Sequence, residues 1–111
     1  MARGVVVTGM GLVTPVGSTL EAFWRSLLEG RCGAAPIRSF DTSSFRHQIG
    51  CEVRDFDAAA ALGPGASRHG RATQMGIAAG LAALDDAGLR QGLPAERTAV
   101  VLGTTLGEPQ F

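Results

Sequence analysis

Apolar positions near the start of the chain predict a strand followed by a helix. Val5–Val7 is an uninterrupted β-branched run, typical of a strand buried on both faces in a parallel sheet. Ser18 and Glu21 then fit a capping box. The next apolar residues recur with helical spacing on one stripe: Leu20, Phe23, Trp24, Leu27 and Leu28. We expect Gly30 to end this helix and Trp24 to be a core anchor.

Two further strands are predicted later in the chain. Ile49, Cys51 and Val53 alternate with Gly50 and Glu52, which indicates a short half-buried strand. The stretch 58–66 contains Gly63-Pro64-Gly65 and is interpreted as a surface connection. Residues 99–102 form a second continuous apolar run, followed by a glycine loop.

A second helix is expected from about Arg68 to Ala87, with Gly88 just after its end. One face of this helix carries only small residues, which suits close packing against another backbone: Gly76, Ala79, Gly80 and Ala83. Asp85 and Asp86 near its end run against the helix dipole. The order strand, helix, strand, helix, strand indicates an α/β fold with a mostly parallel sheet.

Composition narrows the possible function. The chain has 111 residues, 45% of them apolar and 18% charged, which suits one small domain with a core rather than disorder. Its 10 basic and 10 acidic side chains cancel, with no basic cluster for nucleic acid or an anionic membrane. No apolar run is long enough to span a membrane, and the glycines and Pro15 in the uncharged stretch 4–20 argue against a signal peptide. We expect a cytoplasmic protein.

Several motifs and residues that could bind a cofactor or act as a nucleophile do not have the sequence pattern that such a role requires. Gly9-x-Gly11 follows a strand, but a dinucleotide-binding fingerprint needs a third glycine where this chain has Thr14. Cys32 follows a helix C-terminus, which does not favour a thiolate, and Cys51 is expected to point inward. The two histidines, His47 and His69, are flanked by arginines and are interpreted as solvated. We predict no catalytic residue, cofactor site or metal site within these residues.

A family resemblance adds to this interpretation. The opening Val5–Gly17, VVVTGMGLVTPVG, resembles the start of beta-ketoacyl-ACP synthases. The resemblance covers essentially the whole chain in the family's order, through Trp24, Phe40–Ser43, Val53–Asp57, Arg71–Gln74 and Val101–Thr104. It fits the elongating, type II-like branch. Many relatives have an Asp where this chain has Gly70, so we expect weaker capping of the second helix here.

The resemblance implies a thiolase fold, layered α-β-α-β-α in the complete protein. Residues 1–111 are then an incomplete N-terminal ketosynthase domain, because the chain stops at Pro109-Gln110-Phe111 soon after a strand. The family condenses a cysteine-bound acyl chain with malonyl-ACP, and its nucleophilic cysteine, two histidines and lysine lie later in the chain. We therefore expect these residues alone to be inactive and to aggregate. The implied partners are acyl carrier protein and a second ketosynthase-like subunit, in a homodimer or heterodimer, with no cofactor.

One residue is a candidate for contact with substrate. Leu106, in Gly103-Thr104-Thr105-Leu106-Gly107, matches the family's loop that brings an aliphatic side chain to the acyl pocket. Its alternative role is packing in the core or at the dimer interface. Two alternatives to an active synthase stay open: a non-catalytic subunit resembling the chain-length factor, and a decayed protein of 111 residues. A cysteine at the downstream nucleophile position distinguishes the synthase from the chain-length factor.

Overall fold

The computed structural model describes residues 4–107, and the chain divides into two compact units. One unit is the continuous segment Val13–Phe56. The other joins the chain up to Leu12 with the chain from Asp57 onward. The expected chain stop at residues 109–111 lies outside the described residues.

Helix α1 (Leu20–Leu28), in the continuous unit, does not start with the predicted capping box. The Thr19 hydroxyl accepts a hydrogen bond from the Ala22 N–H at 3.2 Å, so Thr19 is the N-cap rather than Ser18. Glu21 then stands two residues after the cap, whereas a capping box requires three. Thr19 takes this role because its extended backbone (φ −135°, ψ 154°) turns its oxygen toward the free N–H groups.

Gly30 ends α1 as predicted, because it supplies the left-handed backbone (φ 65°) of a Schellman turn. The Gly30 N–H donates to the Leu27 carbonyl at 3.1 Å, and the Arg31 N–H donates to the Ser26 carbonyl at 2.9 Å. These two bonds satisfy carbonyls that the helix itself leaves without a partner.

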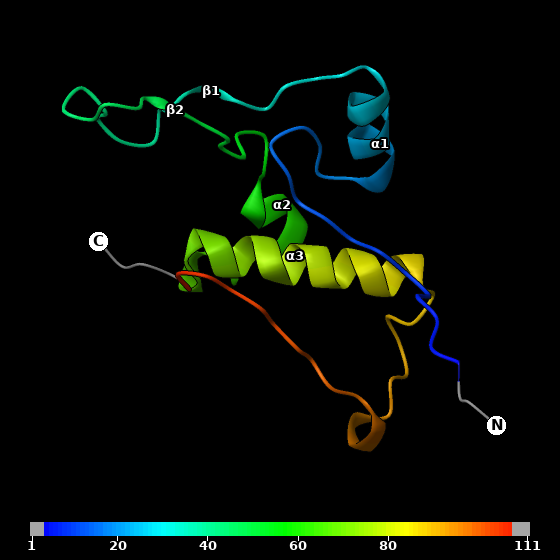
Figure 1. Cartoon of the computed structure of the whole chain (residues 1–111). Helices are drawn as coiled ribbons and strands as arrows, with labels where there is room; N and C mark the ends of the chain where they lie inside the picture. Colours follow the sequence, from blue (N-terminus) through cyan, green and yellow to red (C-terminus); the bar gives the residue numbers. More distant parts are fainter. Residues whose placement is uncertain (1–3, 108–111) are drawn as a thin grey trace. The chain divides into compact units, whose positions relative to one another are not determined.

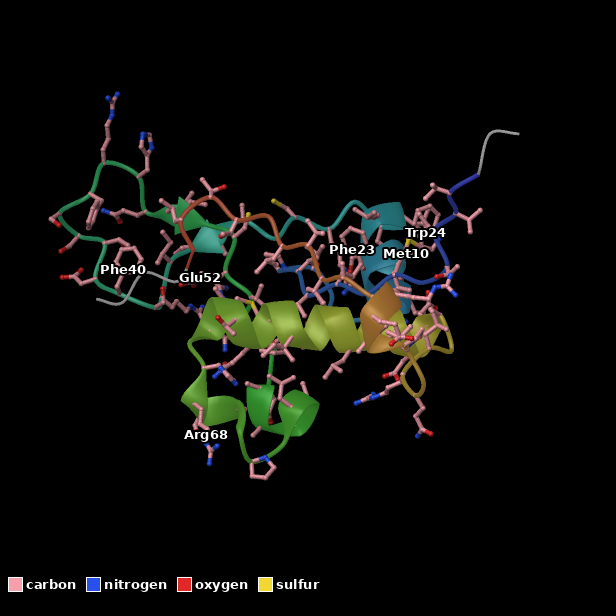
Figure 2. The ribbon with its side chains drawn as sticks, turned by 90° about the horizontal axis from the view of Figure 1, so that it is seen from below. Met10, Phe23, Trp24, Phe40, Glu52 and Arg68 are labelled. Carbon is pink, nitrogen blue, oxygen red and sulfur yellow. The ribbon has the colours of Figure 1, made fainter. Side chains whose placement is uncertain are left out.

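The apolar stripe of α1 is largely exposed, so the prediction that Trp24 anchors a core is wrong for the described chain. Trp24 is 62% exposed and Leu28 is 71% exposed. Figure 2 shows the Trp24 side chain on α1. Ser26 is the buried residue of this helix. An amphipathic pattern shows which face a helix can bury, but it does not show that a partner surface is present to cover it.

Strands β1 (Ala35–Pro36) and β2 (Ile49–Gly50) form an antiparallel sheet with Ala35 opposite Gly50. The sequence pattern predicted a longer second strand and missed the first. Cys51 is exposed rather than turned inward as predicted. The predicted burial is wrong because two short strands without a covering layer have no buried face.

Glu52 holds the loop that follows β1. Its carboxylate, labelled in Figure 2, accepts hydrogen bonds from two backbone N–H groups, that of Arg38 at 3.0 Å and that of Ser39 at 2.9 Å. Hydrogen bonding from the Ser39 side chain, and then from the Arg38 backbone, lowers the pKa of Glu52 to about 2. Arg54 pairs with the same carboxylate at 3.4 Å and donates to the Pro36 carbonyl at 2.7 Å.

The other unit contains α2 (Ala58–Leu62), the 3-10 turn η1 (Ala66–Arg68) and α3 (Arg71–Asp86). The sequence pattern predicted a surface connection where α2 forms. Asp57 caps this helix by accepting a hydrogen bond from the Ala60 N–H at 3.0 Å. The four alanines that follow the cap have the highest intrinsic helix propensity, and α2 packs on α3. Gly63-Pro64-Gly65 breaks the chain only after this helix, because Gly63 is its C-cap and the turn residues follow it.

Helix α3 confirms the second predicted helix, although it begins at Arg71 rather than near Arg68. Gly70 at the N-cap makes no side-chain hydrogen bond, as its missing carboxylate led us to expect. Gly88 adopts the left-handed backbone (φ 67°) just after the helix, and the Leu89 N–H donates to the Leu84 carbonyl at 2.8 Å. Both helices therefore end in the same type of turn.

Residues 9–11 lie against the C-terminal part of α3 (blue in Figure 1), and two glycines let the two backbones touch. A Cβ on Gly9 would lie 2.3 Å from the Ala83 carbonyl oxygen, and one on Gly11 would lie 2.1 Å from the Ala79 carbonyl oxygen. Neither position has room for a side chain, so glycine is required at both. The prediction that the small-residue face admits a neighbouring backbone is confirmed at Ala79 and Ala83.

The two acidic residues at the end of α3 have partners that the sequence pattern did not reveal. The Asp86 carboxylate accepts a hydrogen bond from the Met10 N–H at 2.9 Å, midway between the two packed glycines. Asp85 forms an ion pair with Arg90, beyond the helix. These contacts favour carboxylates at a helix end where the dipole alone disfavours them.

The predicted strands at residues 5–7 and 99–102 are extended but do not pair in a sheet within the described chain. Val6 is 78% exposed, Val5 is 97% and Val101 is 93% exposed. The second segment follows the 3-10 turn η2 (Ala95–Arg97) and leads back toward the start of α3 in Figure 1. Within residues 4–107 the expected parallel sheet does not form, because a buried strand needs neighbouring strands to pair its backbone groups.

We predict that Gly11→Ala destabilises the full-length protein by about 1–3 kcal/mol, because the new methyl group overpacks the contact with α3. Gly4→Ala, in the same segment but with open space around its Cβ, is the matched control and should have little effect. Urea unfolding measures both. Equal free energies of unfolding for the two variants would show that the backbones are not in contact at Gly11.

We predict that Glu52 makes the free energy of unfolding decrease at low pH. Its pKa is about 2 in the folded chain and close to 4.5 when unperturbed, so its contribution is fully present above pH 4.5. That contribution is lost as the pH falls from about 4.5 to 2. Glu52→Gln should remove this part of the acid dependence, as measured by acid unfolding. Glu29→Gln, which breaks only an exposed ion pair with Arg31, should leave it in place.

Candidate functional site

An apolar groove lies between α3 and residues 98–107, within one of the two units. The α3 side of the groove is made of small and aliphatic residues: Ala72, Thr73, Gly76, Ile77, Gly80, Leu81 and Leu84. The extended segment 98–104 forms the opposite side, together with Leu93 and Gly107. No charged side chain lines the groove among the described residues. It is chemically suited to burying hydrocarbon rather than to binding an ion.

The loop that carries Leu106 follows directly after the extended segment. Gly103, Thr104 and Gly107 line the groove, whereas Leu106 does not and is 83% exposed. The Gly107 N–H donates a hydrogen bond to the Thr104 hydroxyl at 3.0 Å, and Gly107 adopts a left-handed backbone (φ 67°). Leu106 therefore stands at the tip of a tight turn beside the groove. Its contact with substrate stays a prediction.

The cysteines and histidines are not assembled into a site. Cys32 and Cys51 are both exposed, and within residues 4–107 no hydrogen bond joins either thiol to a histidine. His47 lies beside β2, whereas His69 follows η1 in the other unit. No group of three or more His, Cys, Asp or Glu in the described part of the chain is placed to hold a metal ion.

A small polar pocket beside α1 was missed by the sequence interpretation. It is lined by the turn 14–18, by Arg25 and Ser26 of α1, and by Arg31, Arg54 and Asp55. Ser26 is only 3% exposed. Arg31 pairs with Glu29 at 2.6 Å, and the Arg54 guanidinium is bonded to Glu52 and Pro36, so two of the three arginines that line the pocket are already engaged. This arrangement fits a role in stabilising the turn.

The sequence pattern did not identify Thr104 as a residue that lines the apolar groove. The signal was present, since a Ser or Thr three residues before a glycine can accept a hydrogen bond from the glycine N–H and close a turn. Thr104 has this spacing to Gly107 whereas Thr105 does not, and the backbone geometry of the loop brings the Gly107 N–H to the Thr104 hydroxyl.

Among the helices formed by residues 4–107, none is both long enough and apolar enough to cross a membrane.

Comparisons with known proteins bear on this architecture. The family model described as beta-ketoacyl synthase, N-terminal domain, matches residues 2–110. The chain is 42% identical over 107 residues to 3-oxoacyl-[acyl-carrier-protein] synthase 2 of Vibrio harveyi, covering 95% of this chain and 26% of that protein. It is 44% identical over 87 residues to the tetracenomycin polyketide synthase ketoacyl synthase beta subunit of Streptomyces glaucescens, covering 77% of this chain and 21% of that one.

A solved structure is also similar to this chain. The ishigamide ketosynthase/chain length factor matches with a TM-score of 0.67 and 39% identity, covering 76% of this chain and 21% of that one. Together with the family match, this similarity indicates a thiolase-like fold. The chain spans about a quarter of the length of the curated relatives. Because the family model covers nearly all of the chain, the protein belongs to the beta-ketoacyl synthase family, within its N-terminal domain.

Proposed function

We propose that the protein containing this chain catalyses the decarboxylative condensation of an enzyme-bound acyl chain with malonyl-ACP. The observation that carries the proposal is the family match over residues 2–110. The Vibrio harveyi relative, whose name specifies a 3-oxoacyl-ACP synthase, supports it. Both fatty-acid and polyketide synthases are among the relatives, and the proposal does not depend on which pathway is served.

In this reaction the acyl group is held as a thioester on a cysteine. Loss of CO2 from the malonyl group breaks a carbon–carbon bond, and its electron pair forms the new bond to the acyl carbonyl carbon. The thioester carbon–sulfur bond then breaks, which releases the enzyme thiolate and leaves beta-ketoacyl-ACP. We assign the nucleophile to a residue outside this chain, because neither Cys32 nor Cys51 matches the family's position or lies in a suitable site.

The role proposed for these residues is to shape the acyl pocket and support the layered α-β-α-β-α core. The apolar groove offers a surface without charged side chains, and the Leu106 loop lies at its edge. We propose acyl carrier protein as the partner that delivers both substrates, and a ketosynthase-like subunit as the partner in a dimer.

The alternative is a non-catalytic subunit that resembles a chain-length factor. Two observations favour keeping it: the match to the tetracenomycin beta subunit, and the match to a structure that contains both a ketosynthase and a chain length factor. A cysteine at the downstream nucleophile position would favour the synthase, and another residue there would favour the alternative.

We predict that the full-length protein, incubated with acyl-ACP and malonyl-ACP, releases CO2 and forms beta-ketoacyl-ACP. Mass spectrometry of the carrier protein measures the product. The double variant Cys32→Ser/Cys51→Ser should keep this activity and its sensitivity to iodoacetamide, since the reactive thiol lies elsewhere. Loss of condensation in that correctly folded variant would contradict the assignment. Condensation only after addition of a separate ketosynthase subunit would favour the alternative.

We predict that Leu106→Ala lengthens the acyl chains accepted by the full-length enzyme. The substitution removes three side-chain carbons, which is room for roughly one further two-carbon unit in a closely packed pocket. Specificity constants for a series of acyl-ACPs measure the effect. Leu106→Ile, which conserves volume, should keep the original preference. A length preference that is unchanged in Leu106→Ala would remove Leu106 from the acyl pocket.

A further inference from the structure

The loop of residues 103–107 is held by one side chain rather than by the backbone. Within the described chain no backbone hydrogen bond involves these five residues, and they belong to no helix or strand. The Gly107 N–H instead donates to the Thr104 hydroxyl at 3.0 Å. This bond closes a turn of four residues with Leu106 inside it. A hydroxyl that accepts from an N–H three residues later is a local substitute for a backbone turn.

Both ends of the turn are conformationally permissive. Gly103 precedes it and Gly107 ends it in a left-handed backbone, with open space around both glycines. Glycine has more accessible backbone conformations than any other residue, so it does not restrict the loop by itself. The Thr104 hydrogen bond is therefore the contact that selects one loop shape.

Packing does not place Leu106 in the described chain. Its side chain is 83% exposed, so its position follows from the backbone that carries it. Thr104 lines the apolar groove together with Gly103 and Gly107. The Thr104 hydroxyl thus connects the wall of the groove to the tip of the loop.

We propose that Thr104 is a positioning residue that fixes Leu106 at the edge of the groove and so sets acyl-chain selectivity. This inference rests on the proposed function. Thr104 itself need not touch the substrate, because it acts through the backbone between residues 104 and 107. The hydroxyl acts as an acceptor here, so serine can replace threonine but valine cannot.

The test uses the full-length enzyme and a series of acyl-ACPs of increasing length. Thr104→Val keeps the shape of the side chain but removes the acceptor. We expect it to weaken discrimination between the preferred acyl chain and longer ones by roughly three- to tenfold, the range for losing one neutral hydrogen bond. Thr104→Ser should restore the original preference. Thr105→Val is the matched control, because the Thr105 hydroxyl has no hydrogen bond within the described chain.

A double variant separates positioning from a general loss of structure. If Thr104 acts through Leu106, adding Thr104→Val to Leu106→Ala should change the length preference no further. An additional shift in the double variant, or an unchanged preference in Thr104→Val while Leu106→Ala shifts it, would overturn the role of Thr104. An unchanged preference in Leu106→Ala would overturn the proposal for Leu106 and, with it, the inference for Thr104. Equal effects of Thr104→Val and Thr105→Val would also overturn it.

Discussion

The direct contact between backbones at Gly9 and Gly11 organises the unit that contains α3. Side chains normally keep the axes of two packed helices about 8–10 Å apart. Here, by contrast, carbonyl oxygens of α3 occupy the space that a Cβ on Gly9 or Gly11 would need. The approach places the Met10 N–H within reach of Asp86, so one hydrogen bond fixes the segment along the helix axis. The position of residues 4–12 therefore depends on missing side chains at two places and on one carboxylate between them.

The same helix presents a different surface toward residues 98–107. Gly76 and Gly80 have open space around them, unlike Gly9 and Gly11, and they face the apolar groove. Glycines in a helix interior cost roughly 1 kcal/mol each relative to alanine, so this arrangement lowers helix stability while it widens the groove. In the proposed function, the groove and the Leu106 loop are the parts that these residues contribute to the acyl pocket.

Several conclusions could be drawn from sequence order alone. The helix periods, the turns at Gly30 and Gly88, and the contact face at Ala79 and Ala83 all arise from interactions within a few residues or from small side chains. The family was also identifiable from its ordered motifs, and the family model confirms it. Local signals failed where two residues of the same type compete, as at Ser18 and Thr19 for the cap of α1.

Only the tertiary structure decides which surface each apolar segment packs against. Residues 5–7 and 99–102 have the pattern of buried strands, yet they are exposed in the described chain, because burial requires partner strands that no local pattern supplies. Trp24 has the spacing of a core residue but lacks a covering surface in the described chain. The contact between Asp86 and Met10 joins residues 76 positions apart, and the Thr104 turn depends on backbone angles. The sequence by itself determined the local elements and the family, whereas pairing, burial and long-range hydrogen bonds depend on which surfaces the folded chain brings together.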